Sequence, residues 1–277
     1  MNIIQRNLFR LIRIGAFEQK EQIEPMSVYK WGQLFQLAVM HDVAGYVYEG
    51  LQRSKSQFFL HLTDKQWQLW EKTVNEIRKK SLHADDEPDE FLRADHLTNP
   101  LLNKKLQAIL DDEQSDIRTR QILLTIIRVS RHILNEGVPI RQLVELGISL
   151  RTEGHHADFT TLGKWLKSLQ LQQVAKLEAS LLMELLGFEK EEIAFAGEKR
   201  DKNVEQVAQE LIEFTNNTRI RDFYFLQDEG EVFVHTSNGS AMLGHIHRSA
   251  RYFRYYPSET LTNFFASFAH SLTHIEE

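Results

Sequence analysis

The stretch from Ser115 to Gly137 indicates the fold class of this chain; it reads Ser-Asp-Ile-Arg-Thr-Arg-Gln-Ile-Leu-Leu-Thr-Ile-Ile-Arg-Val-Ser-Arg-His-Ile-Leu-Asn-Glu-Gly. Its apolar residues recur at steps of three and four, which is the spacing of one helix face. They are Ile122, Leu123, Ile126, Ile127, Ile133 and Leu134. We expect a long amphipathic helix that Ser115 caps at its start and Gly137 ends.

The same spacing extends outward in both directions from this helix. Upstream, stripes of apolar residues start near Ile4 and Trp31, and Thr63 and Gln66 have the spacing of a capping box before a further stripe. Pro100 and Pro139 each suit the first position of a helix. Helical patterns follow over residues 159–169, 171–187 and 204–214. With 13 glycines and 5 prolines in 277 residues, the chain has few of the turn residues that many-stranded folds need. The sequence therefore predicts a mostly α protein built from helical bundles.

One short region is typical of strands instead. Phe223-Tyr-Phe-Leu226 and Val232-Phe-Val234 flank a turn-like Asp228-Glu-Gly230. We expect a hairpin-like excursion near residues 222–235.

The run from Asp85 to Glu90 divides the chain, because it holds five acids around a proline. Such a run repels itself and has no apolar surface to bury, so it is typical of a connector, although it could also bind a basic partner. The predicted organisation is an N-terminal helical bundle over 1–81, an acidic linker over 82–97 and a C-terminal helical region over 98–277.

Composition narrows the classes of function. The net charge of −6 and the pI of about 6.1 argue against a dedicated nucleic-acid protein or attraction to anionic membranes. Zero cysteines exclude a disulfide framework and a thiolate site. Arginines interrupt the apolar residues of the first 17 positions, so no secretory signal is expected, and no apolar run is long enough to span a membrane. We expect a cytoplasmic protein without membrane partners.

Motifs for catalysis and cofactor binding are missing from the sequence. Neither G-x-x-x-x-G-K-[ST] nor G-x-G-x-x-G occurs, and there is no G-x-S-x-G. The pairs His155-His156 and His245-x-His247 have no Asp or Glu at helical spacing to complete a metal site. We predict no catalytic residue, no metal and no cofactor.

The most distinctive segment is His245-Ile-His-Arg-Ser-Ala-Arg-Tyr-Phe-Arg-Tyr-Tyr256. Its arginines recur every three residues among aromatic side chains, and the segment contains no acid. One interpretation is an amphipathic helix whose aromatic residues pack inward and whose arginines pair with acids elsewhere. The other is a site for a phosphate-containing ligand or an acidic partner, because arginine binds phosphate in a bidentate manner. The candidate residues are His245, Arg248, Arg251, Arg254 and Tyr255.

Three blocks of the sequence resemble a known family. They are Leu8-Phe-Arg-Leu-Ile-Arg-Ile-Gly15 with the Trp31–Tyr48 segment, His132–Leu143, and Arg248–Glu259, which contains Tyr255-Tyr-Pro-Ser-Glu259. In this order they resemble the helical parts of the uncharacterised bacterial nucleotidyltransferase family, whose members often accompany genes for surface polysaccharides. The resemblance would imply a nucleotide-binding sheet with a G-D-x-D metal motif between the first two blocks.

This chain departs from that pattern, because no G-D-x-D occurs in it and only about 50 residues of acidic and helical character stand where the sheet would be. Nucleotidyl transfer needs two carboxylates that hold a divalent cation. We therefore expect a non-catalytic relative, a pseudoenzyme that binds a partner protein, a second copy of itself or a ligand. The alternative is a transferase that holds a nucleotide or sugar phosphate on the Arg248/Arg251/Arg254 stripe. Nucleic-acid binding by the same stripe is a weaker third hypothesis.

Overall fold

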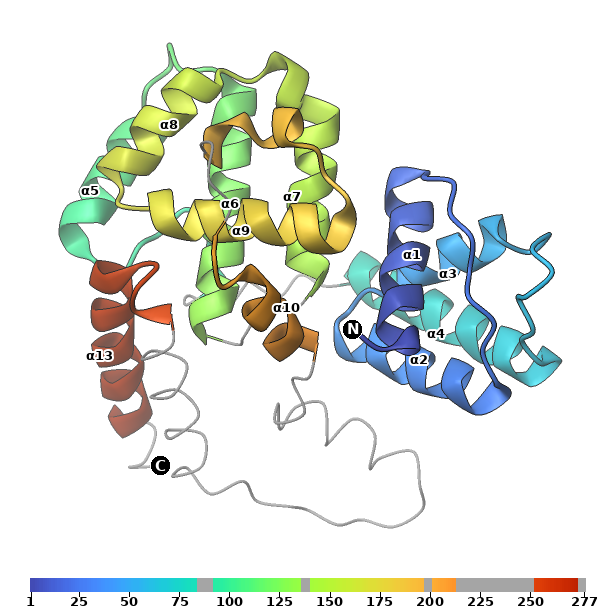
Figure 1. The fold of residues 1–277 in the computed structure, drawn as a ribbon. Coiled ribbons are helices and arrows are strands. Elements are labelled where there is room, and N and C mark those ends of the chain that lie inside the picture. The colour runs from blue at the N-terminus through green and yellow to red at the C-terminus, as the bar shows by residue number, and fades with distance from the viewer. Residues whose placement is uncertain (84–91, 136–139, 197–200, 213–251, 274–277) are drawn as a thin grey trace.

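The computed structural model describes residues 1–83, 92–135, 140–196, 201–212 and 252–273, and these residues fold mainly into helices (Figure 1). The predicted mostly α class is therefore confirmed. The helices are α1 (Ile3–Phe17), α2 (Val28–Met40), α3 (Ala44–Arg53), α4 (Asp64–His83), α5 (Pro100–Leu110), α6 (Ile117–Asn135), α7 (Ile140–Glu153), η2 (Gly154–His156), α8 (Phe159–Ser168), α9 (Gln172–Leu186), η3 (Lys190–Ala196), α10 (Val204–Ile212) and α13 (Pro257–Thr273). The hairpin predicted near residues 222–235 lies outside the described residues.

Two of the predicted helix starts are confirmed by their hydrogen bonds. The Thr63 backbone N–H donates to Gln66 Oε1 at 3.1 Å, and the Gln66 N–H donates to Thr63 Oγ1 at 3.3 Å, so the capping box at the start of α4 is formed. Pro100 is the first residue of α5, and the Asn99 side chain caps that helix.

The predicted start of α6 is off by one residue. Asp116 caps the helix, because its Oδ2 accepts the Thr119 N–H at 2.8 Å. The hydroxyl of Ser115 instead donates to the Asp112 carbonyl oxygen at 2.8 Å. Serine and aspartate are both good N-caps, and the preceding turn uses the serine. The predicted stop at Gly137 lies outside the described residues, and α6 ends at Asn135.

In the N-terminal part, α1 and α3 cross in backbone contact. A Cβ on Gly15 would lie 2.0 Å from the Tyr46 carbonyl oxygen, and a Cβ on Gly50 would lie 2.1 Å from the Leu11 carbonyl oxygen. Only glycine permits this approach at either position. The apolar stripe of α2 packs beside this crossing, with Trp31, which the sequence places on that stripe, buried.

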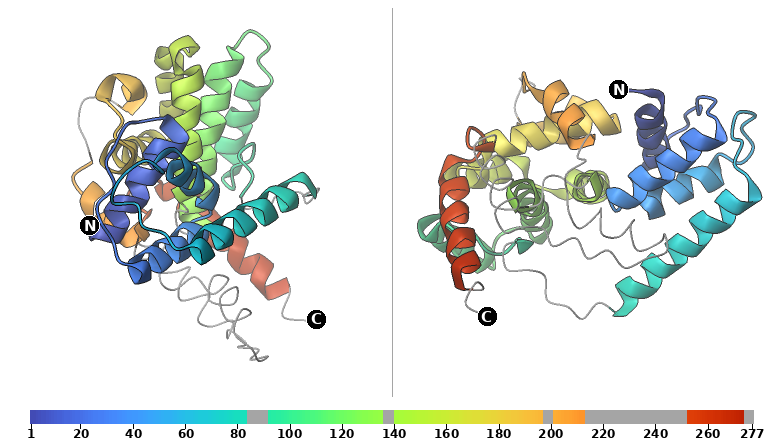
Figure 2. Two further views of the ribbon diagram at one scale, coloured as in Figure 1. Left: turned by 90° about the vertical axis from the view of Figure 1, so that its right-hand side faces the viewer. Right: turned by 90° about the horizontal axis from the view of Figure 1, so that it is seen from below.

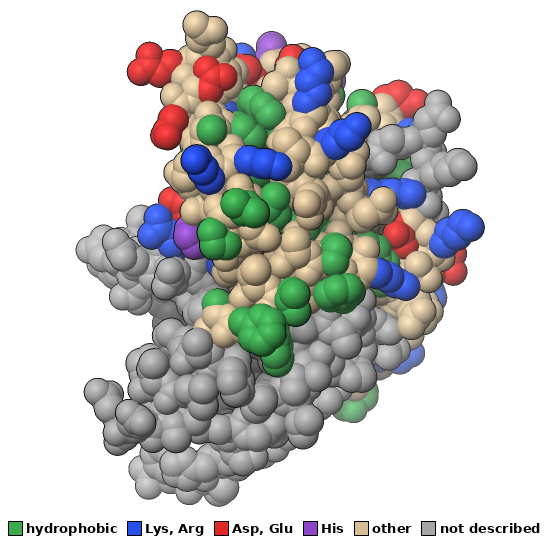
Figure 3. Space-filling model, turned by 90° about the vertical axis from the view of Figure 1, so that its left-hand side faces the viewer, with side chains coloured by type: hydrophobic (Ala, Val, Ile, Leu, Met, Phe, Trp, Pro, Cys, Tyr) green, Lys and Arg blue, Asp and Glu red, His purple; other side chains and the backbone are tan. Residues whose placement is uncertain are grey.

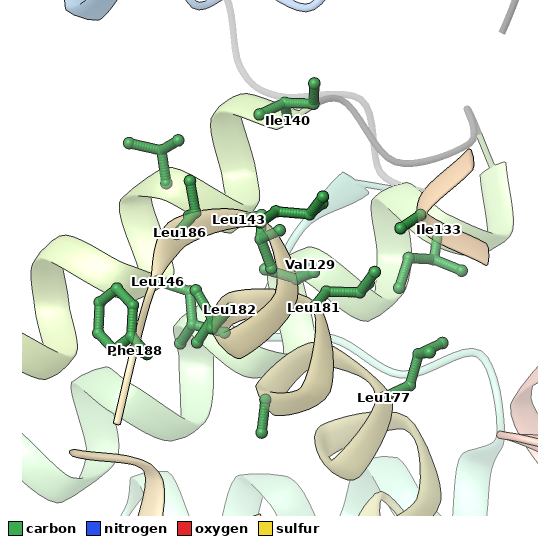
Figure 4. Packing of buried hydrophobic residues seen from close by; sticks show 14 of the residues in the cluster. Val129, Ile133, Ile140, Leu143, Leu146, Leu177, Leu181, Leu182, Leu186 and Phe188 are labelled. Atoms are coloured by element: carbon green, nitrogen blue, oxygen red, sulfur yellow. The ribbon is translucent and has the colours of Figure 1, made fainter. Parts of the chain in front are cut away.

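The core of the C-terminal part forms where α9 runs across α6 and α7 (Figure 1). Figure 4 shows leucine, isoleucine and valine side chains of these three helices directed toward one another, with Phe188 at one edge. Burial of this apolar surface is the main source of stability for such a bundle.

The two helical parts contact each other through α1, α7 and α9. The Arg13 guanidinium of α1 donates to the Leu185 carbonyl oxygen of α9 at 2.8 Å. The Arg151 guanidinium of α7 lies over two rings, with Cζ 4.7 Å from the ring centre of Phe17 and 4.2 Å from that of Phe188. Phe17 and Phe188 also pack edge to face, with their ring centres 5.4 Å apart.

The N-terminal helices α1–α4 and the last helix, α13, lie at opposite sides of the molecule (Figures 1 and 2). The acidic run from Asp85 to Glu90 lies outside the described residues, but the end of the predicted linker is held on α5. Leu97 is buried there, and its N–H donates to Asn103 Oδ1 at 3.0 Å.

Among the helices that the structure describes, none has an apolar stretch long enough to cross a membrane.

Candidate functional site

Of the five residues predicted for a binding site, the structure describes Arg254 and Tyr255. His245, Arg248 and Arg251 lie outside the described residues. Tyr255 is buried and Arg254 is exposed, in a turn that leads into α13.

Arg254 and Tyr255 form a stacked pair. The Arg254 guanidinium lies over the Tyr255 ring, with Cζ 4.6 Å from the ring centre, and its Nη2 donates to the Tyr255 hydroxyl at 2.8 Å. That hydroxyl donates to Asp201 Oδ1 at 3.3 Å. Burial raises the pKa of Tyr255, and the nearby Asp201 charge raises it further. Arg254 forms no ion pair with a carboxylate of the described residues, so most of its donors are available to an anion.

Glu259, in the first turn of α13, is buried, and both of its carboxylate oxygens accept hydrogen bonds. No pattern in the sequence pointed to this role. Glu259 Oε1 accepts the Thr98 N–H at 2.6 Å and the Arg131 Nη1 at 2.8 Å, and its Oε2 accepts the Asn99 N–H at 3.0 Å. The ion pair with Arg131 has side chains that are 1% and 0% exposed. A carboxylate at the amino end of α5 is also stabilised by the positive end of the helix dipole.

Further contacts fix one side of α13 on the body of the molecule. The hydroxyls of Thr262 and Thr98 lie 2.8 Å apart, and Asn263 Nδ2 donates to Asn135 Oδ1 at 2.7 Å. The Tyr256 hydroxyl donates to the Leu169 carbonyl oxygen at 3.2 Å, and burial raises the pKa of Tyr256. Tyr255, Tyr256 and Glu259 are thus all engaged in internal contacts.

The opposite side of α13 is apolar and exposed. Leu261 is 51% exposed and Phe265 is 60% exposed, one helical turn apart, and Leu101 at the start of α5 is 76% exposed. The Thr98–Thr262 contact brings the start of α5 against α13. Figure 3 views this side of the molecule and shows groups of hydrophobic side chains among lysines and arginines. We call Leu101, Leu261 and Phe265 the α13 face. The sequence carried one signal for it, since no Lys, Arg, Asp or Glu occurs between Glu259 and Glu276.

A second buried acid lies between α6 and α9. Glu178 is 0% exposed, and its Oε1 lies 2.9 Å from Ser130 Oγ, which lies 3.0 Å from the Ile126 carbonyl oxygen. A hydroxyl has one hydrogen and a carbonyl can only accept, so both contacts are satisfied when the carboxyl itself donates to Ser130. Burial raises the pKa of Glu178 well above its usual range, which agrees with a protonated carboxyl.

The described residues contain no group of three or more histidine, aspartate or glutamate side chains arranged to hold a metal ion. His155 and His156 lie in η2 and are exposed, whereas His245 and His247 are outside the described residues.

No protein family, no curated protein and no solved structure shows significant similarity to this chain.

Proposed function

We propose that the chain is a non-catalytic helical protein, related to the uncharacterised bacterial nucleotidyltransferase family, that acts by binding another protein. The observation that carries the proposal is the α13 face, where Leu261 and Phe265 of α13 and Leu101 of α5 are exposed. Buried hydrogen bonds and an ion pair hold the other side of α13 in place. Exposed apolar groups on a fixed helix are typical of surfaces that bind other proteins. The partner is a different protein or a second copy of the chain.

Titration of the protein with nucleoside triphosphates and Mg²⁺ distinguishes a non-catalytic binding protein from a transferase. We expect no Mg²⁺-dependent binding of any nucleoside triphosphate by isothermal titration calorimetry, and no release of pyrophosphate. Tight, metal-dependent binding of one triphosphate would show that a catalytic site is present and would contradict the proposal.

Sedimentation equilibrium tests the second-copy form of the proposal. If the chain pairs through the α13 face, the average molecular mass measured by sedimentation rises with protein concentration. The variant Leu261→Gln/Phe265→Gln should abolish this rise. A mass that stays at that of one chain leaves a different protein as the partner.

A second candidate is a site for a phosphate-containing ligand at Arg254. The observation that favours it is that this guanidinium is exposed, is oriented by the Tyr255 ring, and has no carboxylate partner among the described residues. We expect nucleotides or sugar phosphates to raise the melting temperature of the unmodified protein and to lose this effect in Arg254→Gln. The similarly exposed Arg128→Gln is the control. If no phosphate compound stabilises the unmodified protein, this candidate is wrong.

A further inference from the structure

Four exposed lysines lie on α5 and α8: Lys104, Lys105, Lys164 and Lys167. The start of α5 and the end of α8 both contact the α13 segment, through Thr98–Thr262 and Tyr256–Leu169. Lys105 Nζ donates to the Ser168 carbonyl oxygen at 3.3 Å, so the end of α8 lies beside the lysines of α5. None of the four forms an ion pair with a carboxylate of the described residues. We call these four residues the lysine rim.

The lysine rim differs from the group of arginines on α1. On α1, Arg6 and Arg10 pair with Glu24, and Arg13 pairs with Glu21. Those charges are balanced within the fold and hold the segment after α1. In the lysine rim only Lys164 has a nearby carboxylate whose electrostatics it affects among the described residues, since its charge contributes to lowering the pKa of Asp158. The rim keeps this excess of positive charge although the whole chain carries a net charge of −6. Repulsion among grouped lysines lowers the free energy of unfolding slightly. We therefore expect these lysines to serve in binding an acidic group of another molecule.

We propose that the α13 face and the lysine rim together bind an acidic amphipathic helix of a partner protein. This rests on the proposed function, because it names the chemistry of the partner for the same surface. The apolar stripe of such a helix would cover Leu101, Leu261 and Phe265, as in other helix-binding surfaces. Aspartates and glutamates beside that stripe would face the lysine rim, which gives complementary charge and sets the orientation.

Charge argues against a second copy as the occupant. A two-fold interface places the same surface on both sides, so it would bring the lysine rim of one copy to the lysine rim of the other, or close to it. Like charges across an interface cost binding energy, and the described part of the α13 face supplies no acid to offset them.

Charge also argues against an anionic membrane or nucleic acid. Asp111, Asp112 and Glu113 are exposed directly after the carboxyl end of α5, the helix that carries Lys104 and Lys105. In Figure 3, acidic side chains gather at the upper edge of this side of the molecule. An extended anionic surface would meet both signs of charge, whereas a short helix can lie on the basic and apolar part alone.

The test is a selection from a displayed library of random peptides about 16 residues long, which is roughly four helical turns. The full chain is the bait, and Lys104→Glu/Lys167→Glu is the counter-selection bait. We expect enriched peptides with Leu or Phe at helical spacing and an excess of Asp and Glu beside them. Their affinity, measured by fluorescence anisotropy, should fall about ten-fold or more in Lys104→Glu/Lys167→Glu.

The matched control is Lys30→Glu/Lys65→Glu, which makes the same change of charge on exposed lysines of the N-terminal part. It should leave the affinity within about two-fold, and circular dichroism checks that both variants are folded. An equal loss in the two variants, no enrichment, or enriched peptides without acidic excess would overturn the proposal. So would binding of anionic vesicles or of DNA with the same dependence on Lys104 and Lys167. Each of these results differs from Mg²⁺-dependent triphosphate binding, which would overturn the proposed function instead.

Discussion

Glu178 is an acid that the fold keeps away from water and from any described cation. Its raised pKa means that the folded chain keeps a proton that the unfolded chain releases above its usual pKa near 4.5. The contribution to stability is therefore complete below that pH and is lost as the pH rises toward the folded pKa. At neutral pH, the free energy of unfolding is therefore lower than it would be with a side chain at position 178 that cannot ionise.

We expect Glu178→Gln to raise the free energy of unfolding at neutral pH. The amide can donate to Ser130 as the protonated carboxyl does, and it has no proton to lose. The difference between the variant and the unmodified protein should grow by about 1.4 kcal/mol per pH unit above the unfolded pKa, up to the folded pKa. Urea unfolding over a series of pH values measures this. The exposed Glu71→Gln is the control, and a difference that does not change with pH would contradict the argument.

Glu259 is a buried acid of the opposite kind, because it is ion-paired. We expect Glu259→Gln to lower the free energy of unfolding by about 3 kcal/mol, since it removes the carboxylate charge from a buried ion pair with Arg131. Hydrogen exchange over residues 257–273 should rise more than exchange over α9.

The double variant Arg131→Met/Glu259→Leu separates the cost of removing one charge of the pair from the value of the pair itself. It removes both charges and should be less destabilised than Glu259→Gln alone. If the two variants lose equal stability, the effect comes from packing and not from the charge.

At the scale of elements, the crossing of α1 and α3 depends on Gly50. We expect Gly50→Ala to lower the free energy of unfolding by about 3 kcal/mol, because its Cβ would collide with the Leu11 backbone and force the two helices apart. Gly45→Ala lies in the same helix with open space around it, and it should raise stability by about 0.5 kcal/mol through helix propensity. Chemical denaturation measures the free energy of unfolding of both variants. If Gly50→Ala and Gly45→Ala change it equally, the close contact of α1 with α3 does not require glycine at position 50.

The helices themselves could be predicted from apolar spacing and from local caps. The capping box at Thr63 and the proline at position 100 depend on neighbouring residues only, and both predictions are confirmed. The cap of α6 was placed one residue early because Ser115 and Asp116 are chemically equivalent in this role and a contact with Asp112 decides between them.

The candidate site could be predicted only in part. Arg254 and Tyr255 stood out in the sequence as basic and aromatic neighbours. The role of Glu259 could not be predicted, because its partners Thr98, Asn99 and Arg131 are more than 100 residues away along the chain. No local pattern carries such a contact.

At the scale of the whole molecule, Arg151 joins the two helical parts. We expect Arg151→Met to lower the free energy of unfolding by about 1–2 kcal/mol, because it removes the contact of a cation with Phe17 and Phe188 and the ion pair with Glu192. Arg118→Met is the control, since Arg118 also pairs with a glutamate but is 48% exposed, and such pairs contribute little. Thermal unfolding of both variants distinguishes them. A loss no larger than that of Arg118→Met would show that the ring contacts do not stabilise the junction.

Local patterns in the amino-acid sequence were enough to predict that the chain is helical and where α4 and α5 begin, because helix spacing and caps act over a few residues. The packing of the folded chain was needed to show that Gly15 and Gly50 let two backbones touch, that Arg151 lies between the two parts, and that Glu259 is buried. It also decided which side of α13 remains exposed. The physical reason is that these contacts join residues far apart in the sequence, and their energies depend on distance and burial, which no local pattern records.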